Sequence, residues 1–138
     1  MKESTILKWK SGMAFEADVD GYKIGVDALP ESGGQNNGPR PKPLLMASLA
    51  GCTAMDVISI LQKMRVEVDD FTITTIGDLA EEHPKYFMGM HLVYSFKGKD
   101  LPLDKLEKAI SLSEERYCGV WATLRKAMNI TYEIKILD

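Results

Sequence analysis

The fold is decided by residues 38–65, which read GPRPKPLLMASLAGCTAMDVISILQKMR. From Leu44 to Arg65 the stretch contains no proline and one glycine, and apolar side chains fall on nearly every side of the helical wheel. This pattern predicts a helix of about 33 Å, started by Pro43 and buried in the middle of an assembly. Since a chain of 138 residues can hardly cover such a helix alone, we expect a second copy of the chain to cover part of it.

Short strands are expected before this helix. Polar and apolar residues alternate over Met13 to Val19, and similar runs at Thr5 to Trp9 and Tyr22 to Val26 complete a predicted three-stranded antiparallel meander. Residues 28–43, ALPESGGQNNGPRPKP, contain four of the six prolines and three of the eleven glycines, so they predict a long loop. Loops of such length inside a domain tend to be functional or mobile.

Strands and helices also follow the long helix. Residues 71–80 and Tyr86 to Phe96 predict two strands, and in the second of these the even positions form one apolar face. Helical spacing begins near Pro102 and breaks near residues 117–119, and residues 130–136 alternate as a last strand. The order βββ-α-ββ-αα-β predicts an α+β fold in which antiparallel strands pack on helices.

Length and composition indicate a soluble globular protein. Hydrophobic residues make up 45% and charged residues 27% of the chain, and its 138 residues suit a single domain over residues 1–138. The net charge is −3 and no basic run is present, which argues against a nucleic-acid partner. The first ten residues, MKESTILKWK, are too polar for a signal peptide or a membrane span, so we expect a cytoplasmic protein that does not bind a membrane.

Cys52 lies on the predicted helix in a polar stripe that also contains Ser48, Asp56 and Ser59. A thiol nucleophile acts as the thiolate. The helix start is too distant for its dipole to favour the thiolate and an ionised Asp56 disfavours it, so a reactive Cys52 needs a cation from another segment. The alternative is that Cys52 is a small buried hydrophobe in a tight Ala-Gly-Cys packing patch.

Cys118 falls at the expected junction of two helices, where unpaired backbone N–H groups favour a thiolate; a packing role is equally open. His83 and His91 are the two histidines, and together with the cysteines they raise the possibility of zinc. The chain has no CxxC or HxxxH spacing, and His91 falls on the strand face opposite the apolar row. We therefore expect neither a metal nor another cofactor.

The stretch 38–65 together with residues 113–134, SEERYCGVWATLRKAMNITYEI, resembles the OsmC/Ohr family of osmotically inducible and organic hydroperoxide resistance proteins, and in particular its small OsmC-like branch. This resemblance covers nearly the whole chain. It implies an intertwined homodimer with paired central helices and active sites at the interface. It also implies that Cys52 attacks the terminal oxygen of a peroxide, that Cys118 resolves the sulfenic acid as a disulfide, and that a small thiol or dithiol reduces this bond.

The activating residues of the family are replaced here. Peroxidase members of the family use an arginine from the amino-terminal strand region and a glutamate nine or ten positions ahead of the helix cysteine. This chain has Lys42 and Pro43 at the glutamate positions and no arginine before Arg40. We expect Arg40 to be the cation that reaches Cys52, with Lys42 as a second candidate.

Two functions follow from these residues. The first is a peroxiredoxin-like, cysteine-based peroxidase of the oxidative stress response, which reduces organic hydroperoxides or hydrogen peroxide through Cys52, Cys118 and Arg40. Its pocket for an alkyl peroxide is expected to include four apolar residues: Met13, Phe15, Met55 and Trp121. The second is a non-catalytic protein of the same fold that binds an apolar ligand or senses redox state.

Overall fold

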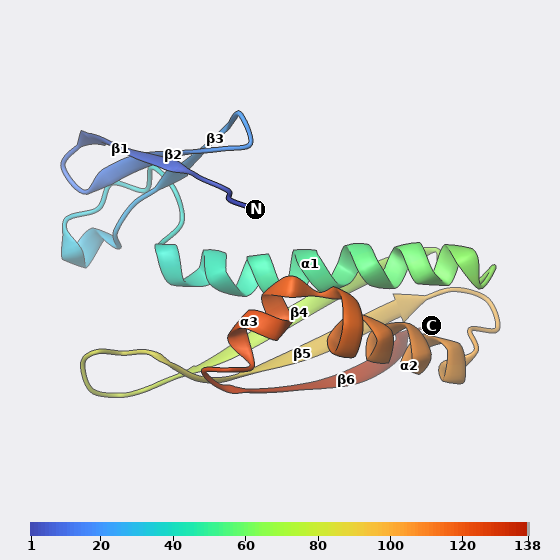
Figure 1. Cartoon of the computed structure of the whole chain (residues 1–138). Helices are drawn as coiled ribbons and strands as arrows, with labels where there is room; N and C mark the ends of the chain where they lie inside the picture. Colours follow the sequence, from blue (N-terminus) through green and yellow to red (C-terminus); the bar gives the residue numbers. More distant parts are fainter. Residues whose placement is uncertain (138) are drawn as a thin grey trace. The chain divides into compact units, whose positions relative to one another are not determined.

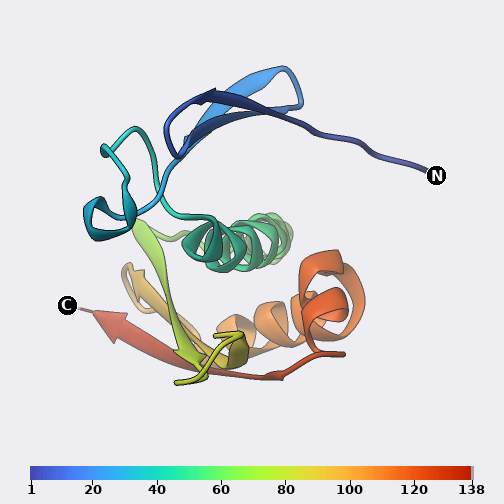
Figure 2. The same cartoon turned by 90° about the vertical axis from the view of Figure 1, so that its left-hand side faces the viewer.

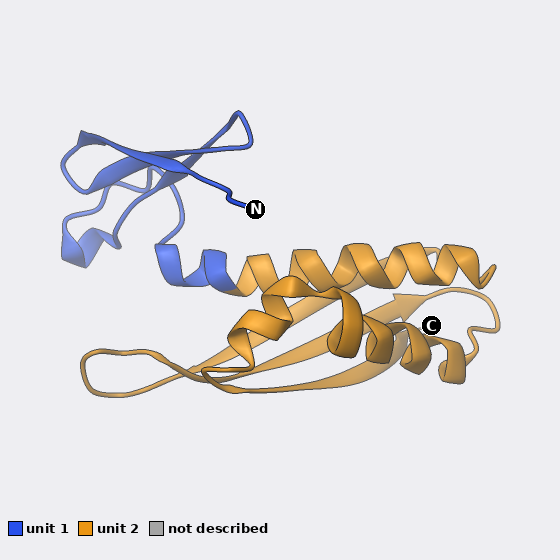
Figure 3. Cartoon of the chain, viewed as in Figure 1, with its two compact units in different colours: residues 1–45 blue, residues 46–138 orange. Residues whose placement is uncertain are grey.

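The structure is a computed structural model that describes residues 1–137. The chain divides into two compact units, Met1–Leu45 and Met46–Asp138 (Figure 3). The expectation that residues 1–138 form one domain stays a prediction.

The first unit contains the expected meander. Strands β1 (Ile6–Ser11), β2 (Ala14–Val19) and β3 (Tyr22–Val26) form an antiparallel sheet in the order β1-β2-β3. In the second hairpin Val19 pairs with Tyr22, and the two residues between them, Asp20 and Gly21, have φ values of 53° and 83°. Positive φ at both positions is the requirement of a type I′ turn, which explains the Asp-Gly sequence there.

The loop after β3 is held by a buried carboxylate. Asp27 is 3% exposed, and its carboxylate accepts the backbone N–H groups of Ala28 at 2.7 Å and of Gln35 and Asn37 at 3.1 Å. The N–H of Gln35, followed by that of Asn37, lowers the pKa of Asp27 below its usual value. The loop also contains a short 3₁₀ turn, η1 (Pro30–Ser32). Three hydrogen bonds to the Asp27 carboxylate therefore hold the main chain of residues 28–37 in place.

The long helix α1 spans Pro41–Lys63, so it begins before the Pro43 start that the sequence predicts. Its first turn accommodates Pro41 and Pro43 because the first N–H groups of a helix have no partner within it. After its last residue, Lys63, the chain turns at Arg65, which has a φ of 59°. The N–H of Val66 donates to the carbonyl of Leu61 at 2.9 Å. This left-handed residue is typical of a helix C-terminus.

The second unit contains a mixed sheet. Strands β4 (Asp70–Leu79), β5 (Phe87–Lys97) and β6 (Asn129–Leu137) lie in the order β4-β5-β6, with β4 antiparallel and β6 parallel to β5. The parallel pairing differs from the all-antiparallel expectation. Its cause is the helical crossover between β5 and β6, since such a connection returns the chain in the same direction. The α+β class itself is confirmed.

The crossover consists of α2 (Leu103–Leu112), a π-helical turn η2 (Ser113–Tyr117) and α3 (Gly119–Leu124). Helices α1 and α2 lie on the same face of the sheet, as Figures 1 and 2 show. Buried side chains from α1, β5, α2 and α3 form one core, which includes Leu49, Val57, Leu61, Leu92, Phe96, Leu106, Ile110 and Trp121. Most even positions of β5 face this core, as predicted.

One stripe of α1 is buried within its own chain. The buried residues are Leu49, Thr53, Val57 and Leu61, which recur every fourth position and therefore share one side of the helix. Other apolar positions remain accessible, and Met55 is 75% exposed. A single chain thus covers only part of this apolar helix.

Candidate two-thiol site

Cys52 lies near the middle of α1 and is half-buried against the core. It does not sit on the buried stripe, which passes through the next residue, Thr53. Cys52 packs against the core, as the packing interpretation expects, but a single chain leaves it only half-buried. Both interpretations of Cys52 stay predictions.

Cys118 caps the first turn of α3, and its Sγ accepts the N–H of Trp121 at 3.3 Å. The residue is 2% exposed, and both cysteines are free thiols. The side chains of Cys118 and Cys52 are close enough for each to act on the other. The structure thus brings together the two cysteines that the sequence analysis singled out.

The environment of Cys118 favours the thiol. Burial raises its pKa above the ordinary range, and the neighbouring Cys52 side chain raises it further. The N–H of Trp121 acts in the opposite direction, but the charge of Asp56 adds to the increase. A backbone N–H does favour the Cys118 thiolate, as expected, but removal from water outweighs this one donor.

A series of hydrogen bonds joins four side chains of the segments that carry the two thiols and of β5. Ser113 Oγ donates to Asp56 Oδ2 at 2.8 Å and lies 2.8 Å from Thr53 Oγ1, which in turn lies 2.9 Å from the hydroxyl of Tyr94. Thr53, Tyr94 and Ser113 are each 0% exposed. Four residues from α1, β5 and the π-helical turn are therefore joined inside the core.

The carboxylate sets the direction of this series. Each hydroxyl has one proton to donate. Ser113 gives its proton to Asp56, so Thr53 must donate to Ser113, and Tyr94 must donate to Thr53. Burial raises the pKa of Tyr94 above its ordinary range, so the phenol keeps the proton that this order requires. The hydroxyls of Thr53, Tyr94 and Ser113 each donate one hydrogen bond.

Ser113 also holds the main chain of Cys118. It is the first residue of η2, and its carbonyl accepts the N–H of Cys118 at 2.8 Å. This is the hydrogen bond between residues five apart that defines a π-helical turn, a feature often found at functional sites. Through its side chain and its carbonyl, Ser113 connects α1 to Cys118.

A cavity of about 370 Å³ opens beside this chain of hydrogen bonds. Asp56 and Lys63 provide charged groups in its wall, and Tyr117, next to Cys118 in the sequence, provides an aromatic ring. The remaining lining residues are Ser59, Ile60, Met64 and Leu112. Trp121, expected in the wall of a peroxide pocket, is instead 1% exposed and belongs to the core.

Arg40 lies in the first unit, directly before α1. It lines a cavity of about 390 Å³ together with Asp27, Leu29, Ser32 and Lys42. Lys42 and Pro43, which stand where the family has its glutamate, belong to the first turn of α1. The approach of Arg40 to Cys52 stays a prediction.

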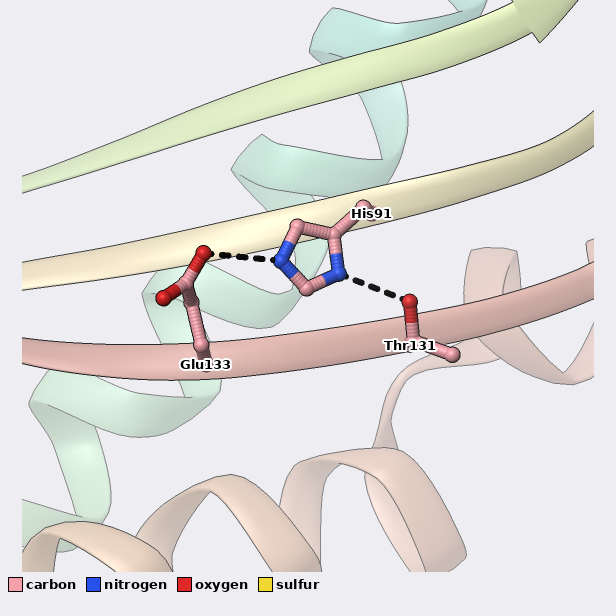
Figure 4. A network of polar contacts seen from close by, with 3 residues as sticks. All are labelled: His91, Thr131 and Glu133. Atoms are coloured by element: carbon pink, nitrogen blue, oxygen red, sulfur yellow. Dashed lines mark hydrogen bonds and ion pairs between the residues drawn. The ribbon is translucent and has the colours of Figure 1, made fainter.

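The side-chain contacts of His91 are with residues other than the two cysteines. His91 is on β5, where Nδ1 lies 2.7 Å from Thr131 Oγ1 and Nε2 lies 3.0 Å from Glu133 Oε1 on β6 (Figure 4). It points away from the apolar face, as predicted. Within residues 1–137 no cluster of three or more His, Cys, Asp or Glu side chains could hold a metal ion.

Sequence reasoning missed three members of the site: Thr53, Tyr94 and Ser113. Tyr94 was assigned only to an apolar strand face, which is where its ring lies. No pattern connects it to a serine and a threonine from distant segments. Asp56 was recognised as a neighbour of Cys52, but its bond with Ser113 depends on the packing of α2 and η2 against α1.

Residues 34–133 match the family model described as OsmC-like protein. Protein YhfA of Escherichia coli strain K12 is 34% identical over 132 residues, which cover 95% of this chain and 96% of that protein. The crystal structure of a hypothetical protein from Aquifex aeolicus matches with a TM-score of 0.84 at 30% identity, covering 100% of this chain and 99% of that one.

The organic hydroperoxide resistance protein OhrB of Bacillus subtilis shares the fold with a TM-score of 0.67 at 20% identity, and the match covers 98% of each chain. The family model and the Escherichia coli relative confirm the resemblance that residues 38–65 and 113–134 indicate. The chain therefore belongs to the OsmC-like family, within the OsmC/Ohr group of proteins.

Proposed function

We propose that this protein is a thiol-dependent peroxidase in which Cys52 reacts with the peroxide and Cys118 resolves the product. The observation that carries the proposal is that a half-buried Cys52 and a buried Cys118 lie next to each other. An accessible sulfur is required for attack on a substrate, and a second thiol at contact distance is required for resolution.

In the first step the Cys52 thiolate attacks the terminal oxygen of a hydroperoxide. The oxygen–oxygen bond breaks, the sulfur becomes a sulfenic acid, and the released alkoxide takes up one proton to become an alcohol. Hydrogen peroxide gives water in place of the alcohol. This proton comes from solvent, so the Cys118 thiol keeps its own proton for the second step.

In the second step the Cys118 sulfur attacks the sulfenic acid of Cys52. A disulfide forms, and the hydroxyl group leaves as water with the proton of the Cys118 thiol. The N–H of Trp121, at 3.3 Å from Cys118 Sγ, stabilises the negative charge that develops on this sulfur. A small thiol or dithiol then returns the disulfide to two thiols by exchange.

Peroxide consumption tests this proposal. The purified protein is mixed with cumene hydroperoxide or hydrogen peroxide and a dithiol, and the peroxide that remains is measured over time. We expect turnover by the wild type and none above background by C52S. With the dithiol left out, C118S should consume one peroxide per Cys52 and leave a sulfenic acid that dimedone traps. Equal rates for the wild type and C52S with several peroxides would overturn the proposal, and native mass spectrometry would then test the ligand-binding alternative.

We further propose that two copies of the chain form a homodimer. Its support is the exposed apolar surface of each unit, which includes Ile6, Leu7 and Trp9 on β1, each at least 60% exposed, and Met55 on α1 at 75%. Sedimentation at several concentrations tests it. A dimer for the wild type and a monomer for M55E are expected, and a wild-type monomer at all concentrations would contradict it.

Helix α1 is long and apolar enough to cross a membrane by length and composition alone. We assign its apolar side to the second copy rather than to lipid, because Asp56 near its middle is charged and bonded to Ser113 of the same chain. We also propose a cytoplasmic location, which two free thiols support. Fractionation of cells tests both statements, and recovery in the membrane fraction would contradict them.

A further inference from the structure

The chain of hydroxyls joins the two segments that carry the thiols. Thr53 directly follows Cys52 on α1, and Ser113 begins the π-helical turn that ends at Tyr117, the residue before Cys118. The hydroxyls of Thr53 and Ser113 are 2.8 Å apart, and Asp56, one turn after Cys52, accepts from Ser113 at 2.8 Å. Two hydrogen bonds thus connect the Cys52 helix to the Cys118 turn at one serine.

The same serine determines where Cys118 lies. Its carbonyl accepts the Cys118 N–H at 2.8 Å, and its N–H belongs to the last turn of α2 through Ala109 and Ile110. A shift of the Ser113 side chain relative to α1 would therefore move the main chain of Cys118. Apolar packing alone fixes such a position less well because it is not directional. The hydrogen bonds between Ser113 and two residues of α1, Thr53 and Asp56, are directional.

We propose that Asp56 and Ser113 are positioning residues of the two-thiol site: their hydrogen bond holds the π-helical turn against α1 and thereby sets Cys118 opposite Cys52. This inference rests on the proposed two-thiol function, which it deepens by naming the residues that make the thiols a pair. Neither residue is assigned contact with peroxide. Their effect is on the effective concentration of one thiol at the other.

Thiol–disulfide equilibrium measures this effect without a peroxide. In a buffer of reduced and oxidised dithiothreitol, the protein dithiol gives two electrons and two protons to oxidised dithiothreitol, so that the Cys52–Cys118 disulfide forms and dithiothreitol becomes the dithiol. Mass spectrometry after acid quenching and alkylation gives the equilibrium constant. That constant is the effective concentration of the protein thiols relative to those of dithiothreitol.

Three variants and one control define the test. We expect S113A and D56A to lower the constant about tenfold, which corresponds to about 1.4 kcal/mol, the scale of one hydrogen bond. D56N should stay within about twofold of the wild type, because its amide oxygen still accepts from Ser113. The control is S111A, which removes a hydroxyl from the end of α2, where Ser111 neighbours Tyr132 of β6.

The outcomes separate the explanations. Unchanged constants in S113A and D56A, or an equal fall in S111A, would overturn the proposal. A fall in D56N as large as in D56A would show that charge rather than the hydrogen bond acts, which also contradicts it. If S113A does not fold, D56A carries the test, because Asp56 is only half-buried. A wild type that forms the disulfide but consumes no peroxide would remove the proposed function alone.

Discussion

Replacement of Thr53 by valine is the sharpest test of the buried hydrogen bonds. Valine keeps the shape of threonine but neither donates to Ser113 nor accepts from Tyr94, whose distances to Thr53 Oγ1 are 2.8 and 2.9 Å. The phenol of Tyr94, at 0% exposure, is then left without an acceptor. An unsatisfied buried donor costs about 1–3 kcal/mol, so T53V should lower the free energy of unfolding by about 2–3 kcal/mol.

A double-mutant cycle isolates the contact. Y94F alone leaves Thr53 still donating to Ser113, so its cost should be about 1 kcal/mol. In T53V/Y94F the unsatisfied phenol is gone, so the double variant should be more stable than the sum of the single losses predicts by about 1–2 kcal/mol. Urea unfolding under reducing conditions, at one protein concentration because of the proposed dimer, provides the values.

Thr75 offers a matched control in the same unit. Its Oγ1 is buried and has no hydrogen-bond partner within residues 1–137. T75V therefore removes a hydroxyl that makes no bond, and it should be neutral or slightly stabilising. Additive losses for T53V and Y94F within about 0.5 kcal/mol, or equal losses for T53V and T75V, would refute the reasoning.

Three further predictions concern other parts of the chain. The lowered pKa of Asp27 gives stability that is present above the ordinary carboxyl pKa and lost as pH falls through the lowered value, so unfolding curves of the wild type and D27N should converge in acid. G77A should lower the free energy of unfolding by about 1–3 kcal/mol in thermal melts, because its Cβ would lie 2.5 Å from the ring of Phe87. Iodoacetamide should modify Cys52 before Cys118 at pH 8, as peptide mass spectrometry can show, because the raised pKa keeps the buried Cys118 a thiol.

The elements of this fold are predictable because periodic burial produces them. The alternation in β5 and the apolar run of α1 come from side chains that face one core, so their spacing is visible in the sequence. Asp20-Gly21 marks a turn for an equally local reason. The parallel pairing of β6 is different, because residue alternation is the same in parallel and antiparallel strands.

The site is predictable only in part. Cys52 and Cys118 stand out by their chemistry, but the burial that raises the pKa of Cys118 is not visible in the local sequence. Burial of a thiol depends on segments far away in the sequence. Ser113 carries no local signal at all, since a single serine in an amphipathic helix usually lies in solvent.

The position of the hydroxyl chain argues that it serves the thiols rather than stability alone. Buried polar groups stabilise a core no better than apolar side chains of the same shape, and they cost free energy whenever one partner is lost. Here they lie where a π-helical turn interrupts the helices, and that turn ends beside Cys118. Departures from regular structure and from apolar packing are expected at functional sites. The π-helical turn and the buried hydrogen bonds meet at Ser113, which contacts the helix that carries Cys52 and the backbone N–H of Cys118. The need to hold the two sulfurs together explains why both features occur at this residue.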